Sequence, residues 1–531
     1  MTLSSSPPAS DCPPHTRRRW LGGLAACVGS VALPGCAPAV IDQARAADRP
    51  RFGLGVASGH PQHDRLVLWT RLTGADLPDQ VEVSWELAED EAFSRIAARG
   101  RDSARVDEAH SVHAEPAGLA PDRWYHYRFS ALGQQSPVGR TRTAPTPGTR
   151  VEHLKFAIAS CQRWDHGHYA AWRHMAAEQL DLVVFLGDYI YEYATPPGRA
   201  LAPGRVHEGG VTRTLDQYRA RYAQYKSDPA LQAMHAAAPW LITWDDHEVE
   251  NDYAGLQGNA LQPDFASQRA AAYRAWWEHM PVPRRMKPVG PDLRIVGSYD
   301  WGDLARFLMA DGRQQRSPQA CNPPGKGGSR SLREGECAEL RDPTRSFLGH
   351  AQEAWLAQAW STGHRWNLLA QPTLMARFAT RDKSQNSGEP DKVWTDGWEG
   401  YPLARQRLLQ TVADRRVPGA IVLGGDVHTS YVADLKPDWR DDKAPVVASE
   451  FCGTSITSQG WTQAAMAPHL ALLPHIRYGR GDDHGYMAFT VTAKETTVHV
   501  RSVDDVLKAD SGMHTDASFV VEYNRPGAST L

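Results

Sequence analysis

The chain has 531 residues, of which 41% are hydrophobic and 22% charged, and this balance excludes an intrinsically disordered protein. Its formal net charge of −3 provides no bulk attraction to nucleic acid or to an anionic membrane, so an anionic substrate has to be held by local charges or by metal ions. No nucleic-acid partner is required on this basis. The length predicts two or three domains.

The beginning of the chain has the features of an export signal. Arginines at 17–19 precede an uncharged apolar run at 21–33, which is shorter than the roughly 20 residues of a membrane span. This arrangement is typical of a twin-arginine signal, so residues 1–46 are predicted to address the protein to the twin-arginine translocation machinery, for a periplasmic or extracellular location. Two cleavage sites remain open: one at Cys36, which would leave a lipid anchor, and one after Ala46.

Residues 49–143 are predicted to form a small all-β, immunoglobulin-like domain. Short runs rich in β-branched and aromatic residues are separated by turn residues, as in a β-sandwich. These runs lie at 66–70, 81–85 and 124–129. The segment 141–149 (TRTAPTPGT) is a linker by composition.

A second domain is predicted at 150–531, where apolar strand-like runs alternate with longer stretches of helical periodicity. The predicted central strands cover 154–159, 182–186, 241–243, 367–370 and 421–423. The predicted helices cover 169–179, 215–224, 267–279 and 352–360, and a strand pair follows at 487–493 and 496–503. Cys321 and Cys337 bracket a loop rich in Gly, Pro and Arg, and they are candidates for a disulfide bond after export.

Four of the predicted strands end in polar clusters. The clusters are 159–162 (ASCQ), 187–192 (GDYIYE), 244–248 (WDDHE) and 424–429 (GGDVHT). Because ligands gather at the carboxyl ends of strands in an open α/β sheet, we expect these side chains to meet. They form a mixed set of sulfur, nitrogen and oxygen donors. A thiolate or a phenolate favours a transition metal such as iron, and the remaining oxygen donors suit calcium, magnesium or manganese.

Each of these residue types, taken alone, has a structural explanation. A single Asp after a Gly at a strand end is more often a turn or a helix cap than a ligand, and a single buried Cys is usually a small hydrophobic core residue. Four clusters that each follow an apolar strand favour a metal site over these explanations. Two cations about 3.5–4 Å apart can clamp a phosphoryl group, which predicts phosphoester hydrolysis by a metal-activated hydroxide.

The same clusters resemble the metallophosphoesterase superfamily, and specifically the PhoD-type alkaline phosphatases, which include phospholipase D-like enzymes. The resemblance extends from about residue 52 to the end of the chain and includes three more segments: 52–61 (FGLGVASGHP), 68–72 (LWTRL) and 309–313 (MADGR). It implies an α/β metallophosphoesterase-like β-sandwich flanked by helices. The chain departs from the usual family pattern at His60, where Asp is commoner, and in the segment 449–455 (SEFCGTS).

The resemblance also implies a pair of unlike metal ions, Fe3+ and Ca2+. The implied iron ligands are Cys161, Asp188, Tyr191 and His428. Asp188 would also bridge to calcium, with Asp246 and Asp426 completing the calcium shell. Asp311 is a further candidate metal ligand. Two like divalent ions, such as Zn2+ or Mn2+, are the alternative.

Five other residues are predicted to act on the substrate. His247 stands where the superfamily keeps a histidine facing the phosphate, so it is predicted to stabilise transition-state charge or to protonate the leaving group. Arg313 is predicted to bind phosphate oxygens, with a solvated surface arginine as the alternative. Asn251, Arg221 and Trp398 are the predicted substrate-binding residues. An ordinary amphipathic helix is the alternative explanation for the segment that contains Arg221.

Together these features predict an exported alkaline phosphatase that hydrolyses small phosphomonoesters and also phosphodiesters. A phospholipase D-like phosphodiesterase is one alternative. An alternative of another class is a non-catalytic protein that binds carbohydrate or a surface through the sandwich and its Trp-rich loops. That alternative does not explain why Cys161, Asp188 and His428 follow strands as a set of metal-binding residue types.

Overall fold

A computed structural model describes residues 51–381, 391–441 and 443–531. The predicted export signal, with Cys36 and Ala46, lies outside these residues. The described residues belong to one compact unit that begins at Pro50. Among the helices of these residues, none has the length and apolar character needed to cross a membrane.

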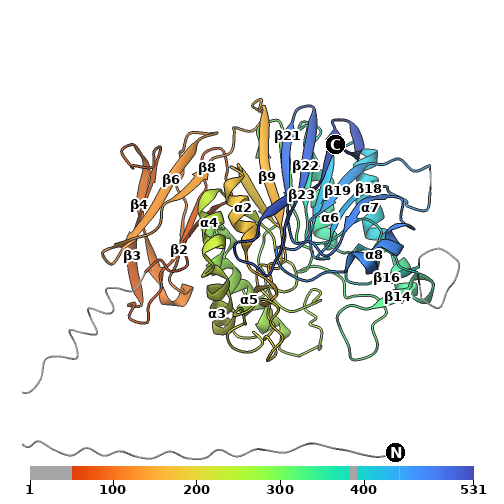
Figure 1. Cartoon of the computed structure of the whole chain (residues 1–531), viewed down its shortest axis with the longest axis horizontal. Coiled ribbons are helices and arrows are strands. Elements are labelled where there is room, and N and C mark those ends of the chain that lie inside the picture. The colour runs from red at the N-terminus through yellow and green to blue at the C-terminus, as the bar shows by residue number, and fades with distance from the viewer. Residues whose placement is uncertain (1–50, 382–390, 442) are drawn as a thin grey trace, which may run out of the picture. The chain divides into compact units, whose positions relative to one another are not determined.

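A ten-stranded sheet runs through the unit and contains three of the predicted central strands (Figure 1). In order across the sheet its strands are β24 (Arg525–Thr530), β23 (Met513–Glu522), β22 (Glu495–Val503), β21 (Gly485–Thr492), β9 (His153–Ala159), β10 (Leu182–Phe185), β11 (Trp240–Ile242), β1 (Val56–Gly59), β2 (Val67–Arg71) and β5 (Ser111–Ala114). The strands β9, β10 and β11 are parallel neighbours. Their sequences are almost continuously apolar because both faces of these strands are covered.

A seven-stranded sheet contains the other two predicted central strands. In order it consists of β12 (Gly297–Trp301), β13 (Ala305–Met309), β15 (Trp366–Ala370), β17 (Ala420–Gly424), β19 (Ala448–Cys452), β18 (Ser430–Leu435) and β20 (Ile476–Arg480). One hydrophobic core joins the two sheets face to face. In this core the ring of Phe156 stacks on Phe489 at 4.5 Å and meets Phe307 edge-on at 5.2 Å. The predicted β-sandwich is therefore confirmed.

Helices cover the outer faces of both sheets (Figure 1). The helices on the ten-stranded sheet are α2 (Ala170–Ala177), α3 (Leu215–Lys226), α4 (Pro229–Ala237) and α5 (Phe265–His279). Those on the seven-stranded sheet are α6 (His350–Ala359), α7 (Pro402–Asp414) and α8 (Gln463–Leu470). Helix α3 begins with a capping box, in which the side chains of Thr214 and Gln217 satisfy each other's backbone N–H groups. Four of these helices, α2, α3, α5 and α6, were predicted from the sequence.

The amino-terminal region is all-β, as predicted. A smaller sheet has the order β4-β3-β6-β7, with β8 also paired to β6, and its strands are β3 (Gln80–Ala88), β4 (Ile96–Arg105), β6 (Trp124–Ala131), β7 (Gln134–Gln135) and β8 (Gly139–Arg142). The strands β1, β2 and β5 extend the ten-stranded sheet, because β1 pairs in parallel with β11 through Gly59 and Trp240. The apolar side chains of both groups share one core.

The four polar clusters do not follow strands of one sheet. The first three come after β9, β10 and β11 of the ten-stranded sheet, whereas the fourth comes after β17 of the seven-stranded sheet. The strand ends that were expected to meet therefore belong to two different sheets. The clusters approach one another because the two sheets face each other. The disulfide between Cys321 and Cys337 is present, with a Cα–Cα distance of 6.0 Å.

Candidate metal centre

The candidate ligands lie where the backbone turns sharply after each strand. Left-handed φ values occur at Cys161 (59°), Asp188 (59°), Asp426 (65°) and His428 (54°). Residues other than glycine seldom adopt this conformation, and it persists only where the surrounding structure enforces it. Such strained positions are common at functional sites, and all four of these candidate ligands adopt one.

Two glycines allow the turns to approach one another closely. Gly187 has a φ of 113°, and a Cβ atom at this position would lie 2.6 Å from the backbone nitrogen of Asp245. A Cβ atom at Gly425 would collide with the Oγ of Ser160. The turn after β10 therefore contacts the turn after β11, and the turn after β17 contacts the one after β9.

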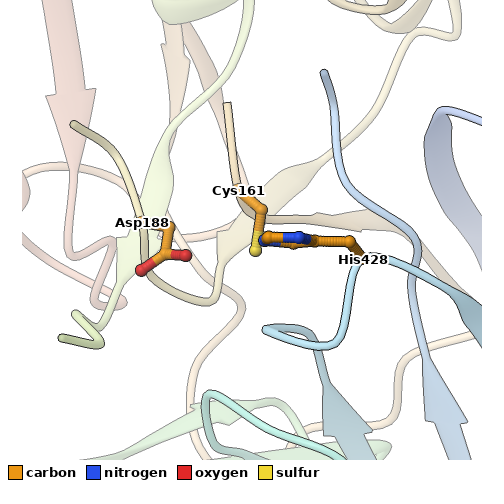
Figure 2. Close-up of side chains that lie close together, drawn as sticks. All are labelled: Cys161, Asp188 and His428. Atoms are coloured by element: carbon orange, nitrogen blue, oxygen red, sulfur yellow. The ribbon is translucent and has the colours of Figure 1, made fainter. Parts of the chain in front are cut away.

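Cys161, Asp188 and His428 come together in space. Their potential ligand atoms all lie within 4.8 Å of one another. In Figure 2 the sulfur of Cys161 lies beside the His428 ring, and the Asp188 carboxylate points toward the same space. The Asp188 Oδ1 atom is buried and has no hydrogen-bond partner. An unpartnered buried carboxylate oxygen is costly, so this donor set fits a bound cation.

Tyr191 joins this cluster as predicted. Its hydroxyl donates to Asp188 Oδ2 at 2.8 Å and lies 3.1 Å from His428 Nε2. The Nδ1 of His428 lies 2.9 Å from the carbonyl oxygen of Gln459, an arrangement in which Nδ1–H donates and Nε2 is left as the ligand atom. Burial lowers the pKa of His428 to about 3, so the imidazole is neutral, as a metal ligand has to be.

A second group of donors shares Asp188 with the first. The ligand atoms of Asp188, Asp246 and His247 also lie within 4.8 Å of one another. Asp246 accepts backbone N–H bonds from His247 at 3.0 Å and from Asp252 at 2.7 Å, which fix the position of its carboxylate. Because Asp188 belongs to both groups, its position suits the predicted bridge between two cations.

Asp426 lies on the same cavity as Asp246, His247 and His428. Its Oδ2 accepts a hydrogen bond from the Thr373 hydroxyl at 2.5 Å. Burial, together with the charges of Asp245 and Asp246, raises its pKa well above the usual range, and burial does the same to the pKa of Asp188. Carboxyl groups that raise one another's pKa are stabilised in the charged form by added positive charge, which supports a cation here.

Arg313 is neither a phosphate ligand in the cavity nor a solvated surface residue, which were the two predictions for it. Its side chain is completely buried, and its guanidinium donates to Asp245 Oδ1 at 2.6 Å and to Asp396 Oδ1 at 3.0 Å. It also lies 3.7 Å from Asp246 Oδ2. With its donors used in this way, Arg313 neither faces the cavity as a phosphate ligand nor lies on the surface. It holds the acidic side chains in position.

Two further predicted residues lie away from the clusters. Asp311 accepts hydrogen bonds from the Trp244 indole at 3.1 Å and from two nitrogens of Gln314 at 2.9 and 3.0 Å, so N–H donors occupy the oxygens offered to a metal. Arg221 donates to the carbonyls of Tyr193 at 2.7 Å and Gly210 at 3.0 Å, and also to that of Tyr191. Arg221 therefore supports the backbone behind Tyr191 and does not line the cavity.

A cavity of about 500 Å³ opens beside the ligand groups. Asn251 and Trp398 both line it, which is where substrate-binding residues are required. Trp398 is held by a hydrogen bond from its indole N–H to Gln371 at 3.1 Å and by stacking on Phe347 at 4.2 Å. Apolar and aromatic side chains, among them Phe378, Trp394 and Trp461, also line it. The cavity can therefore accept both a phosphate and an organic group.

His247 lines this cavity with its ring fixed from two sides. Its Nδ1 lies 2.7 Å from Glu192 Oε2, and its ring lies 4.1 Å from that of Tyr191. Burial alone lowers the pKa of His247, but the nearby carboxylates of Asp246, Glu192 and Asp188 outweigh burial and raise it well above the usual range. A protonated imidazole is a suitable donor to a charged oxygen, as predicted for this residue.

Two buried glutamates, for which the sequence predicted no role, also shape the site. Glu192 accepts the backbone N–H of Asn251 at 2.9 Å in addition to holding His247. Glu248 accepts the N–H groups of Tyr189 at 2.7 Å and Asp245 at 2.9 Å, and so ties together the turns after β10 and β11. Both stand inside recognised motifs, but nothing in the sequence indicates which groups they contact.

The chain is similar to known proteins over most of its length. Residues 156–500 match the PhoD-like phosphatase family. The chain belongs to this family. Residues 35–145 match the N-terminal domain of PhoD-like phosphatases. The chain is 41% identical over 493 residues to alkaline phosphatase D of Bacillus subtilis (strain 168), which covers 90% of this chain and 82% of that protein. It matches the solved structure of PhoD with a TM-score of 0.84 and 39% identity, covering 91% of this chain and 92% of the other. The predicted family and fold are confirmed.

Proposed function

We propose that this PhoD-like protein is an exported, metal-dependent phosphoester hydrolase of the alkaline phosphatase type. The observation that carries the proposal is Asp188, which belongs to two adjoining ligand groups beside a substrate-sized cavity. Cations bound there would offset the negative charge of a phosphate group and lower the pKa of water. The substrates are small phosphomonoesters and phosphodiesters.

The proposed cations are Fe3+ and Ca2+. The thiol of Cys161, the phenol of Tyr191 and the imidazole of His428 form a donor set that suits ferric iron. Asp188, Asp246 and Asp426 offer only oxygen atoms, which suits calcium. A pair of Zn2+ or Mn2+ ions is the alternative. A ferric ion with thiolate and phenolate ligands absorbs visible light, so the absorption spectrum of the purified protein separates the two.

The chain's own side chains have separate tasks in this hydrolysis. The nearby carboxylates raise the pKa of His247 well above its usual range, and with Nδ1 held by Glu192 a protonated Nε2 can donate to a phosphate oxygen or to the leaving oxygen. Asn251 presents its amide to the same cavity, where it can orient the phosphate. Arg313 keeps Asp245 in place next to Asp246.

The proposed route of export depends on residues 1–46 and the twin-arginine machinery, for a periplasmic or extracellular location. The arginines at 17–19 and the short apolar run support it. The disulfide between Cys321 and Cys337 also supports an oxidising compartment. Mass spectrometry of the mature amino terminus distinguishes a lipid anchor at Cys36 from cleavage after Ala46.

The decisive experiment combines elemental analysis with a phosphate-release assay. Asp188→Ala is expected to lose bound metal and activity together, because it removes a donor from both ligand groups. Asp216→Ala is the control, since the Asp216 side chain is 92% exposed on α3. Full turnover in Asp188→Ala would contradict the proposal. A purified wild type without stoichiometric metal would favour the non-catalytic alternative, and hydrolysis of a choline lipid but not of a phosphomonoester would favour the phospholipase D-like one.

A further inference from the structure

A second cavity adjoins the cavity of about 500 Å³ beside the candidate metal ligands, which we call the active-site cavity. It measures about 400 Å³ and shares four lining residues with the first cavity: Ser331, Phe378, Trp394 and Trp461. The two cavities are therefore neighbours, with these four residues between them. We call the second space the outer cavity.

Aromatic side chains form the junction between the cavities. Phe378 and Trp461 meet edge-on at 5.8 Å, and Trp461 contacts the His469 ring at 5.7 Å. Phe378 also packs against Tyr431 at 5.5 Å. Despite these contacts Trp461 remains 43% exposed, so much of its surface is available to a ligand. Rings that are already held in place lose little entropy on binding, which favours stacking with a flat apolar group.

The two cavities are lined by side chains of opposite charge. The active-site cavity is lined by the carboxylates of Asp246, Asp252, Glu399 and Asp426. The outer cavity is lined by Arg381 and Lys392, and the described residues around it contribute no carboxylate. A ligand that spans both spaces therefore meets the metal ligands at one end, aromatic rings in the middle and cations at the other end.

We propose that the outer cavity is a subsite for the alcohol part of the phosphoester, and that it selects a flat apolar group with a negative charge at its far end. This inference rests on the proposed hydrolase function. The phosphate lies at the metal ligands, the apolar group contacts Trp461 and Phe378, and the distal anion lies near Lys392 and Arg381.

Three phosphomonoesters with the same reacting phosphate test the proposal: glycerol 1-phosphate, 1-naphthyl phosphate and a sulfonated 1-naphthyl phosphate. Trp461→Ala is expected to raise KM about tenfold for both naphthyl esters and less than about twofold for the glycerol ester. Lys392→Met is expected to raise KM about threefold for the sulfonated ester alone, as for a solvated ion pair. The values of kcat are expected to change little, because neither residue contacts the reacting atoms.

Matched controls use a tryptophan and a lysine elsewhere. Trp439 lies under the Arg377 guanidinium and lines a third cavity, which shares only Ala376 with the active-site cavity, and the Lys508 side chain is 67% exposed. Trp439→Ala and Lys508→Met are expected to leave all three KM values unchanged. Trp461 follows Gly460, which packs against the His428 backbone, so metal content is measured in every variant. Phe378→Leu, on a different segment, provides a second test of the aromatic contact.

The outcomes separate the subsite from the enzyme activity. Equal KM changes for all three esters in metal-loaded Trp461→Ala and Phe378→Leu would overturn the subsite. An unchanged KM for the sulfonated ester in Lys392→Met would overturn the distal anion preference. Failure of the wild type to release phosphate from any ester would instead contradict the proposed function.

Discussion

Glu192 holds His247 at the wall of the active-site cavity through a contact of 2.7 Å between Oε2 and Nδ1. Both side chains are almost completely buried, at 3% and 9% exposed. The other Glu192 oxygen accepts the backbone N–H of Asn251. One carboxylate therefore orients two of the predicted substrate contacts at once.

The first prediction concerns Glu192→Gln. The amide keeps the size of the side chain but removes the negative charge beside His247. We expect kcat to fall about ten- to a hundredfold with metal content unchanged, the range typical of residues that orient a metal site or its neighbours. Steady-state kinetics and elemental analysis measure this. Glu208→Gln, at an exposed position, is the control, and an unchanged kcat in Glu192→Gln would contradict the role of the contact.

The second prediction concerns Arg313→Met. Removing this guanidinium leaves Asp245 buried without its cationic partner, whereas Asp396 keeps Arg316, and breaking a buried ion pair typically costs about 3–5 kcal/mol. We expect a loss of this size in the free energy of unfolding, measured with urea. Arg101→Met is the control, because Arg101 is 73% exposed and is expected to change stability by less than about 0.5 kcal/mol. Equal stability of the two variants would show that Arg313 does not hold the carboxylates.

The third prediction concerns the disulfide between Cys321 and Cys337, which are 16 residues apart. A crosslink across a loop of this length lowers the conformational entropy of the unfolded chain and so stabilises the folded protein by about 3 kcal/mol. The loop contains Ser329, whose hydroxyl donates to Asp252 Oδ2 at 2.6 Å. We expect Cys321→Ser combined with Cys337→Ser to lower the melting temperature. A reductant is expected to lower the wild-type value toward that of the variant and to leave the variant unchanged. A reductant effect of equal size in both proteins would exclude the disulfide as its cause.

The fourth prediction concerns Glu450, which accepts backbone N–H bonds from Met375 and Ala376, both at 2.6 Å. Burial raises its pKa from 4.5 to about 7, although these two bonds and the charge of Arg405 oppose the shift. Between these pH values the folded protein holds a proton that the unfolded chain has released. Raising the pH through this window therefore lowers the free energy of unfolding, and above about pH 7 the loss is complete.

The Glu450→Gln variant has no carboxyl group to titrate at this position, so it tests the direction in which stability changes with pH. As the pH rises from 4.5 to 7, we expect the stability of the variant relative to wild type to increase by about 3 kcal/mol. Urea unfolding at several pH values across the window measures the difference. A difference that is constant with pH, or that moves in the opposite direction, would contradict the raised pKa.

Local patterns in the sequence were enough to select most residues of the candidate metal site. Each ligand group directly follows an apolar strand, so Cys161, Asp188 and His428 could be selected without knowing which strands are neighbours. The contacts of Arg313 depend on partners 68 and 83 residues away and could not be read from its motif. For the same reason the sequence could not assign the strand before His428 to one of the two sheets, because an apolar run shows that a strand is buried but not which sheet it joins.

The pairing of β1 with β11 affects whether the amino-terminal region and the catalytic region can be expressed as separate fragments. A catalytic fragment that begins at the linker 141–149 would lack β1, β2 and β5, and the free side of β11 would expose unpaired backbone N–H and C=O groups. Bare strand edges recruit other chains and promote aggregation. Either half expressed alone is therefore expected to aggregate, and residues from Arg51 onward should be expressed together as one folding unit.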